Sequence, residues 1–141
     1  MASLYEAVKA LLPAAVTISG TTLTPKAYDT IVREKPSREY WIVTVRLPRV
    51  TGRSEGASVH AHDHRVRVTS VARTPLAVRG LADAAERALD QARVTADGWG
   101  TGLLLAANVT EPTDDPDVTF TDGTTAVFAV TEFVLTASRA A

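Results

Sequence analysis

The residues with the clearest chemical potential are three histidines that alternate along one short segment. His60, His62 and His64 are separated by single residues. In an extended chain every second side chain points to the same face, so the three imidazoles would share a face and could ligate zinc. A zinc site also needs a further ligand and an ordered second shell, and the surrounding segment is polar, without apolar support. We therefore interpret the histidines as part of a solvated loop or a contact surface, and we assign no metal ligand.

A second polar cluster contains three aspartates, Asp114, Asp115 and Asp117. Carboxylates at close spacing suggest calcium, but an EF-hand loop also needs glycine at its sixth position and glutamate at its twelfth. This segment meets neither requirement, and aspartate beside proline is typical of turns. We therefore predict a turn over residues 111–117.

The usual signatures of catalysis are missing from the chain. There is no cysteine, no Gly-x-Ser-x-Gly nucleophile turn and no glycine-rich phosphate loop. The formal net charge is −1, which gives no general affinity for nucleic acid or for a membrane surface. We therefore expect a protein that is not an enzyme and has no cofactor. The N-terminal residues lack the pattern of a signal peptide, so we expect synthesis in a cytoplasm.

Five arginines gather between residues 46 and 67 and could face nucleic acid. They are accompanied by Glu55 and Asp63 in a nearly neutral chain. A solvated or subunit-facing surface explains them better. The five are Arg46, Arg49, Arg53, Arg65 and Arg67.

The strongest element that could position these residues is a helix over residues 74–94. Thr74 can cap it, and Pro75 occupies the first helical position, where its missing N–H costs nothing. One face is apolar and mostly alanine, and Gly80 interrupts it at a cost of about 1 kcal/mol. Small side chains let a helix approach a flat surface closely, so we expect a β-sheet beneath it. The apolar positions are Val78, Leu81, Ala82, Ala85, Ala88, Leu89 and Ala92.

The remaining pattern predicts a short first helix and several strands. The helix spans residues 3–12, with strands at 16–18, 39–48, 65–72, 103–109, 118–121 and 125–137. Residues 28–33 are ambiguous and are read as extended. Between the strands at 39–48 and 65–72 lies a long polar hairpin loop, and Asp122-Gly123 predicts a tight turn before the last strand. A chain of 141 residues is long enough for one domain with a core. We predict a single α+β domain over residues 1–141, with a mostly antiparallel sheet and two helices mainly on one face.

The last predicted strand is apolar on both faces. Residues of odd number from 127 to 135 form one face, and Phe128, Val130, Glu132 and Val134 form the other. A strand of this kind is either central in the sheet or half-covered by a neighbouring subunit.

Several of these segments together resemble a known family. They are the strand RVTSVA leading into a Thr-Pro-started helix, the AAERALD core of that helix, Gly98-Trp99 after it, the Asp-Pro-Asp turn, and a final strand with Phe133 that ends in Ala-Ser-Arg. Over residues 40–139 the chain resembles minor tail proteins of long-tailed, non-contractile phages of actinobacteria, and most closely the tail terminators.

That resemblance implies a structural virion protein at the head-proximal end of the tail. Members of the family form a ring, usually hexameric, that caps the tail tube, stops its polymerisation and joins the tail to the head connector. The implied partners are further copies of the chain, the tail tube protein and the head-tail connector protein, with transient passage of DNA through the lumen and no membrane.

The contacts of such a ring can be assigned to particular segments as a hypothesis. A closed ring needs an interface between two different patches, and the two-faced last strand offers one of them. We expect the subunit interface around Phe128, Val130 and Phe133. We expect the polar hairpin to contact the tube or line the lumen, through Arg49, Arg53, Glu55, His60 and His62.

Two other functions remain open from the sequence. The chain could be a head-tail connector or head-completion protein, which would have partners on the portal side and no contact with the tube. It could also be a small ligand-binding or enzymatic α+β domain in which the three histidines converge with an acidic group.

Overall fold

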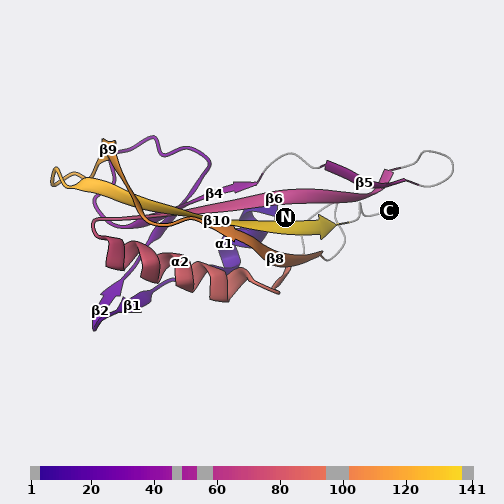
Figure 1. The fold of residues 1–141 in the computed structure, drawn as a ribbon, viewed down its shortest axis with the longest axis horizontal. Helices are drawn as coiled ribbons and strands as arrows, with labels where there is room; N and C mark the ends of the chain where they lie inside the picture. Colours follow the sequence, from indigo (N-terminus) through magenta and orange to yellow (C-terminus); the bar gives the residue numbers. More distant parts are fainter. Residues whose placement is uncertain (1–3, 46–48, 54–58, 95–101, 138–141) are drawn as a thin grey trace.

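The computed structural model describes residues 4–45, 49–53, 59–94 and 102–137, and at residues 49–53 and 59–64 it describes the backbone. Within these ranges the chain forms two helices, one long, curled eight-stranded sheet and a separate two-stranded sheet of β1 and β2 (Figure 1). In chain order the elements are α1 (Leu4–Leu11), β1 (Val16–Ile18), β2 (Thr21–Leu23), β3 (Lys26–Asp29), β4 (Tyr40–Val45), β5 (Arg49–Arg53), β6 (Val59–Ala72), α2 (Pro75–Leu89), β7 (Arg93–Val94), β8 (Gly102–Val109), β9 (Thr113–Thr119) and β10 (Thr125–Ala137).

The main sheet has eight strands and is antiparallel except for the pairing of β3 with β4. Its main order is β3-β4-β6-β10-β8-β7, with β5 added beside β6 and β9 beside β10. The long strands β6 and β10 form its centre, and they pair continuously from Val127–Ala72 to Ala137–His62. Of the two alternatives for the apolar last strand, a central place in the sheet or cover by a neighbouring subunit, the structure shows the central place. The fold class, α+β with a mostly antiparallel sheet, is confirmed.

One face of the sheet carries the main core. On this face every second side chain of the strands is apolar and packs against α2 and Val8 of α1. The helices exclude water from these side chains, which favours their burial. The Ala-rich stripe of α2 lies on β6 and β10, as expected from its small side chains. Fully buried members of this core include Trp41, Val43, Val66, Val68, Leu81, Leu89, Leu104, Phe133 and Leu135.

The start of α2 agrees with the sequence, and its end does not. Thr74 caps the helix by accepting a hydrogen bond from the Ala77 N–H at 3.2 Å, and Pro75 is its first residue. The helix ends at Leu89 instead of continuing to residue 94, because Gln91 adopts a positive φ of 62° and its N–H donates to the Leu104 carbonyl. Residues 93–94 then form β7 against β8.

Two segments expected to be loops or turns form strands. Within the predicted polar hairpin loop of residues 49–64, β5 pairs with the first part of β6, and Figure 1 shows this ribbon extending beyond the end of α2. The predicted turn over residues 111–117 contains most of β9, which pairs with β10. Pro116 is tolerated there because β9 lies at an edge, where a missing N–H breaks no ladder.

The turn at Asp122-Gly123 forms as predicted. Gly123 has a positive φ of 85°, which glycine adopts without strain. The Phe120 N–H donates to the Thr124 carbonyl at 2.9 Å, and the Asp122 carboxylate accepts the Thr124 N–H at 2.9 Å. These bonds connect β9 to β10.

Gly80 of α2 has a packing reason that the sequence does not reveal. A Cβ at this position would lie against the Cγ1 and Cδ1 atoms of Ile18 on β1, closer than carbon atoms can approach. The absence of a side chain therefore lets the β1–β2 hairpin rest directly on the helix.

The contact between Gly80 and Ile18 predicts that Gly80→Ala changes the free energy of unfolding in opposite directions with and without the Ile18 side chain. Gly80→Ala gains about 1 kcal/mol of helix propensity. Displacing Ile18 costs more, about 1–3 kcal/mol, so we expect a net loss of roughly 1 kcal/mol in the free energy of unfolding. In an Ile18→Ala background the clash is absent, and the same change should stabilise the protein. Urea denaturation of the four proteins of this cycle measures both effects, and the same sign in both backgrounds would refute the explanation.

Candidate interaction surface

The sheet face opposite the helices is the candidate functional surface. Along β10 the odd-numbered residues from Val127 to Leu135 are buried in the main core, and Phe128, Val130 and Glu132 point to the opposite side and are half-buried. We call this second side the open face. Its described members, aligned across four strands by the pairing register, are Ile42 and Thr44 of β4, Arg65, Arg67 and Thr69 of β6, Phe128, Val130, Glu132 and Val134 of β10, and Leu105 of β8.

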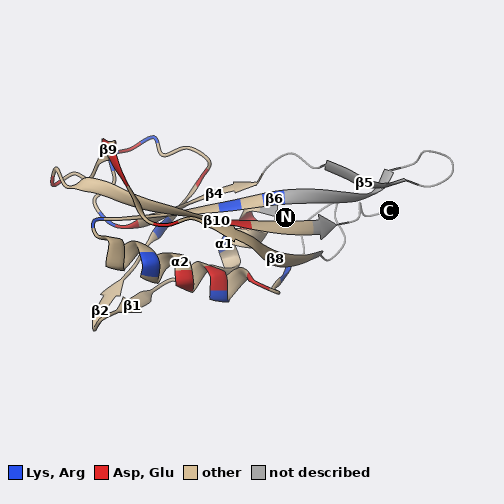
Figure 2. Cartoon of the chain, in the orientation of Figure 1, with Lys and Arg blue, Asp and Glu red and all other residues tan. Residues whose placement is uncertain are grey.

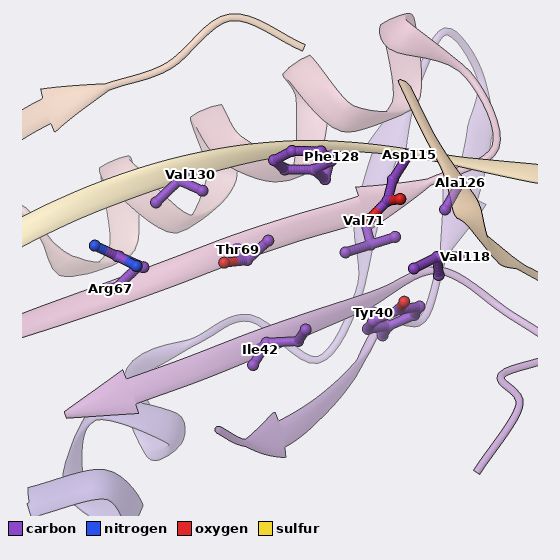
Figure 3. A pocket seen from close by; sticks show the side chains of 10 residues that line it. All are labelled: Tyr40, Ile42, Arg67, Thr69, Val71, Asp115, Val118, Ala126, Phe128 and Val130. Carbon is purple, nitrogen blue, oxygen red and sulfur yellow. The ribbon is translucent and has the colours of Figure 1, made fainter. Parts of the chain in front are cut away.

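A shallow groove of about 250 Å³ runs over part of the open face. Figure 3 shows Phe128 and Val130 along one side, Ile42 and Tyr40 along the other, and α2 behind the sheet. The lining is mainly apolar, which suits the packing of another apolar surface. Arg67 lies at one end of the groove, and Asp115 lies toward the other.

One end of the open face is covered by the chain itself. Tyr40, Val71, Phe120 and Ala126 form a second small core there, with the rings of Tyr40 and Phe120 in an edge contact at 6.0 Å. Burial raises the pKa of the Tyr40 phenol, with a smaller contribution from the charge of Asp115, so the phenol stays neutral at physiological pH. Tyr40 is therefore a packing residue and a poor candidate for a general base.

Arg73 closes this covered end by joining three segments. Its Nη1 lies 3.0 Å from Glu39, its Nε lies 2.9 Å from Asp122, and its guanidinium lies 4.3 Å from the centre of the Phe120 ring. Hydrogen bonds from Thr124, and then the charge of Arg73, lower the pKa of Asp122 to about 2. The carboxylate is therefore ionised, and this end of the face is held together as a structural unit.

The other end of the open face is free of covering elements within the described chain. The Nη2 atom of Arg67 pairs with Glu132 at 3.2 Å, with side chains 37% and 28% exposed. The Nε of Arg67 has no partner in the described structure. The apolar surface continues past this pair through Val134 to Leu105, which is 49% exposed.

Two of the three residues expected at a subunit interface are on this surface. Phe128 and Val130 lie side by side in the groove. The placement of Phe133 at an interface is wrong, because its side chain is fully buried in the main core of the same chain. Side chains alternate between the two faces along a strand. Phe133 is at an odd-numbered position, so it cannot share a contact with Phe128 and Val130 at even-numbered positions.

The residues expected at the tube or lumen are only partly placed. Arg49 and Arg53 belong to β5, and His60 and His62 belong to β6, but their side chains lie outside the described structure. Glu55 lies outside the described residues altogether.

Sequence reasoning did not single out Ile42, Thr69, Arg67 and Leu105 as one surface. The sequence shows how side chains alternate within each strand, but it does not give the register between strands. The pairing in the structure places Leu105 beside Val134 and Thr69 beside Val130. The described part of the chain brings together no group of three or more histidine, cysteine or acidic residues able to hold a metal ion.

Two further observations complete the description of the surface. No helix within the described ranges has the length and apolar character needed to cross a membrane. Searches of protein-family models, of curated proteins and of solved structures find no match to this chain.

Proposed function

We propose that the protein is a tail terminator of a long-tailed, non-contractile phage. In this role it is a structural virion protein, with no catalytic activity, at the head-proximal end of the tail. It forms a ring, hexameric in the proposal, that caps the tube, stops polymerisation and meets the head-tail connector. The proposal rests on the family resemblance over residues 40–139 and on the open face described above.

The open face is the observation that carries the proposal. It joins the half-buried apolar side chains of β4 and β10 with the exposed Leu105 of β8, and β6 between them contributes Arg65, Arg67 and Thr69. Contiguous apolar surface of this kind favours protein–protein contact because burying it releases ordered water. Packing between identical subunits would cover it.

The groove supports a contact surface better than a small-molecule site. At about 250 Å³ it is smaller than most ligand pockets, which hold roughly 300–1,000 Å³. Its titratable members in the described structure are a neutral tyrosine, an ion-paired arginine and a single aspartate. These groups do not form a nucleophile and base pair, so the rival ligand-binding or enzymatic reading has less support.

The proposal is tested by assembly of the purified chain with matched variants. Leu105 on the open face and Leu76 at the start of α2 are both exposed leucines, at 49% and 56%. We expect wild-type protein to form closed rings, alone or on added tail tubes, in light scattering and negative-stain images. Leu105→Asp should abolish the rings because it places a charge in the apolar contact, and Leu76→Asp should preserve them.

The outcomes separate the two parts of the proposal. A wild-type protein that stays monomeric and ignores tail tubes would refute the terminator function. Rings that persist in Leu105→Asp, with circular dichroism showing both variants folded, would refute the open face as the subunit contact. Binding to a portal-side protein without binding to tubes would favour a head-tail connector.

A further inference from the structure

Charge is divided unevenly along the chain. Residues 94–138 contain no lysine or arginine, and they contain seven acidic residues. Most of this acidic stretch builds β8, β9 and β10, and Figure 2 shows red segments on β9 and one on β10 beside the blue segment of β6. The acidic residues are Asp97, Glu111, Asp114, Asp115, Asp117, Asp122 and Glu132.

The acidic residues at β9 are available for a partner. Glu111, Asp114 and Asp117 are exposed, and none of them takes part in the ion pairs that the structure describes. β9 pairs with β10 and lies at an edge of the sheet in the described structure. We call Glu111, Asp114 and Asp117 the acidic edge.

The complementary charge lies on the open face, toward its uncovered end. Arg65 is exposed and has no ion-pair partner among the described residues, and the neighbouring Arg67 is 37% exposed and pairs with Glu132. An arginine guanidinium with unused N–H groups is a strong donor to a carboxylate. We call Arg65 and Arg67 the basic patch.

Asp114 of the acidic edge and Arg65 of the basic patch cannot meet within one molecule. Asp114 aligns with Val127 of β10, and Arg65 aligns with Val134 of the same strand. Seven residues of extended strand separate these positions, which is roughly 23 Å. Asp114 and Arg65 therefore remain open to contacts with another molecule.

We infer that the acidic edge of one copy binds the basic patch of the next copy, head to tail. This inference rests on the proposed ring and names the two patches that form its contact. A closed cyclic ring requires two different, complementary surfaces on each subunit, and patches of opposite charge at separate places on the sheet meet that requirement. The apolar part of the open face supplies the area of the contact, and the charged pairs set its register and direction.

Charge reversal tests the contact with purified full-length protein. Arg65→Glu and Asp114→Arg each place like charges opposite one another in every contact of the ring. We expect each variant to raise the concentration needed for half-assembly by roughly tenfold or more. The double variant, Arg65→Glu with Asp114→Arg, restores opposite charges across the same contact and should recover rings.

Mixing the two single variants gives a sharper test. An Arg65→Glu copy beside an Asp114→Arg copy forms a Glu–Arg contact on one side and the original Arg–Asp contact on the other. Alternating rings should therefore form from two proteins that do not assemble separately. Light scattering gives their mass and negative-stain images give their shape. Arg79→Glu, which reverses an exposed charge on α2, is the matched control and should leave assembly unchanged.

Each outcome bears on a different claim. Wild-type protein that never forms rings would overturn both the inference and the function on which it rests. Wild-type rings that persist unchanged in Arg65→Glu and Asp114→Arg would overturn the inference alone. A mixture that yields dimers instead of closed rings would overturn the head-to-tail arrangement.

Discussion

Replacing Phe133 by alanine is expected to lower the free energy of unfolding by about 3–5 kcal/mol. Its side chain is fully buried in the core beneath the helices, among the largest of the buried side chains. Truncation would remove its contacts and leave a cavity that the surrounding strands and α2 cannot close completely. Typical domains are stable by only about 5–15 kcal/mol, so the variant should be close to its limit of stability.

Phe128→Ala is the matched control on the same strand. Phe128 is half-buried in the groove of the open face, where water can fill the space left by truncation. We expect well under half the loss seen for Phe133→Ala. Urea denaturation at a protein concentration too low for assembly measures both, since assembly would add to the apparent stability. Equal losses would contradict the assignment of the two faces of β10.

Replacing Ser70 by alanine is expected to cost about 1–3 kcal/mol, although it removes only one oxygen atom. The Trp41 Nε1 donates a hydrogen bond to the Ser70 hydroxyl at 3.1 Å, and both residues are buried. Without the hydroxyl, the indole N–H would remain buried with no acceptor, because the surrounding core is apolar. Loss of the bond should also shift the tryptophan fluorescence.

Thr131 provides an internal control for this effect. Its hydroxyl is buried on the same side of the sheet and has no hydrogen-bond partner in the described structure. Thr131→Val removes a hydroxyl that makes no hydrogen bond, so we expect the free energy of unfolding to stay the same or rise under the same denaturation conditions. A comparable loss in Ser70→Ala and Thr131→Val would show that the bond to Trp41 is not the cause.

The two assembly tests and these stability tests address different faces of one sheet. Changes on the helix-covered face should alter unfolding, and changes at Leu105, Arg65 and Asp114 should alter association with little effect on unfolding, because these three side chains are exposed. This separation follows from the alternation of side chains across a strand. It allows the proposed function to be examined without confusing loss of assembly with loss of fold.

Local chemistry determined several elements of this protein. Thr74 accepts a hydrogen bond from an otherwise unpaired N–H of the first turn of α2, and Pro75, the first helical residue, has no N–H to satisfy. The start of α2 could therefore be predicted from the sequence. The Asp122-Gly123 turn follows from the ability of glycine to adopt a positive φ, observed at 85°. The strand Thr125–Ala137 has the predicted bounds, because the segment after that turn is rich in β-branched and aromatic residues and contains neither glycine nor proline.

Tertiary pairing overrode local preference at other places. Residues 113–117 have the composition of a turn, but pairing with β10 makes them part of the strand β9. The helix expected to reach residue 94 ends at Leu89, because the following residues bond to β8. In both cases the deciding contacts join residues that are distant in the sequence.

The sequence by itself determined that β10 has two apolar faces, and it could not determine which face forms the core. Alternation has a period of two and assigns Phe128 and Phe133 to opposite sides, but both sides are apolar enough to be buried. Only the docking of α1 and α2 decided that Phe133 lies inside and that Phe128 and Val130 remain on the open face. The physical reason is that both helices dock on the same face of the sheet, which buries Phe133 with their side chains and leaves the opposite face without a helix.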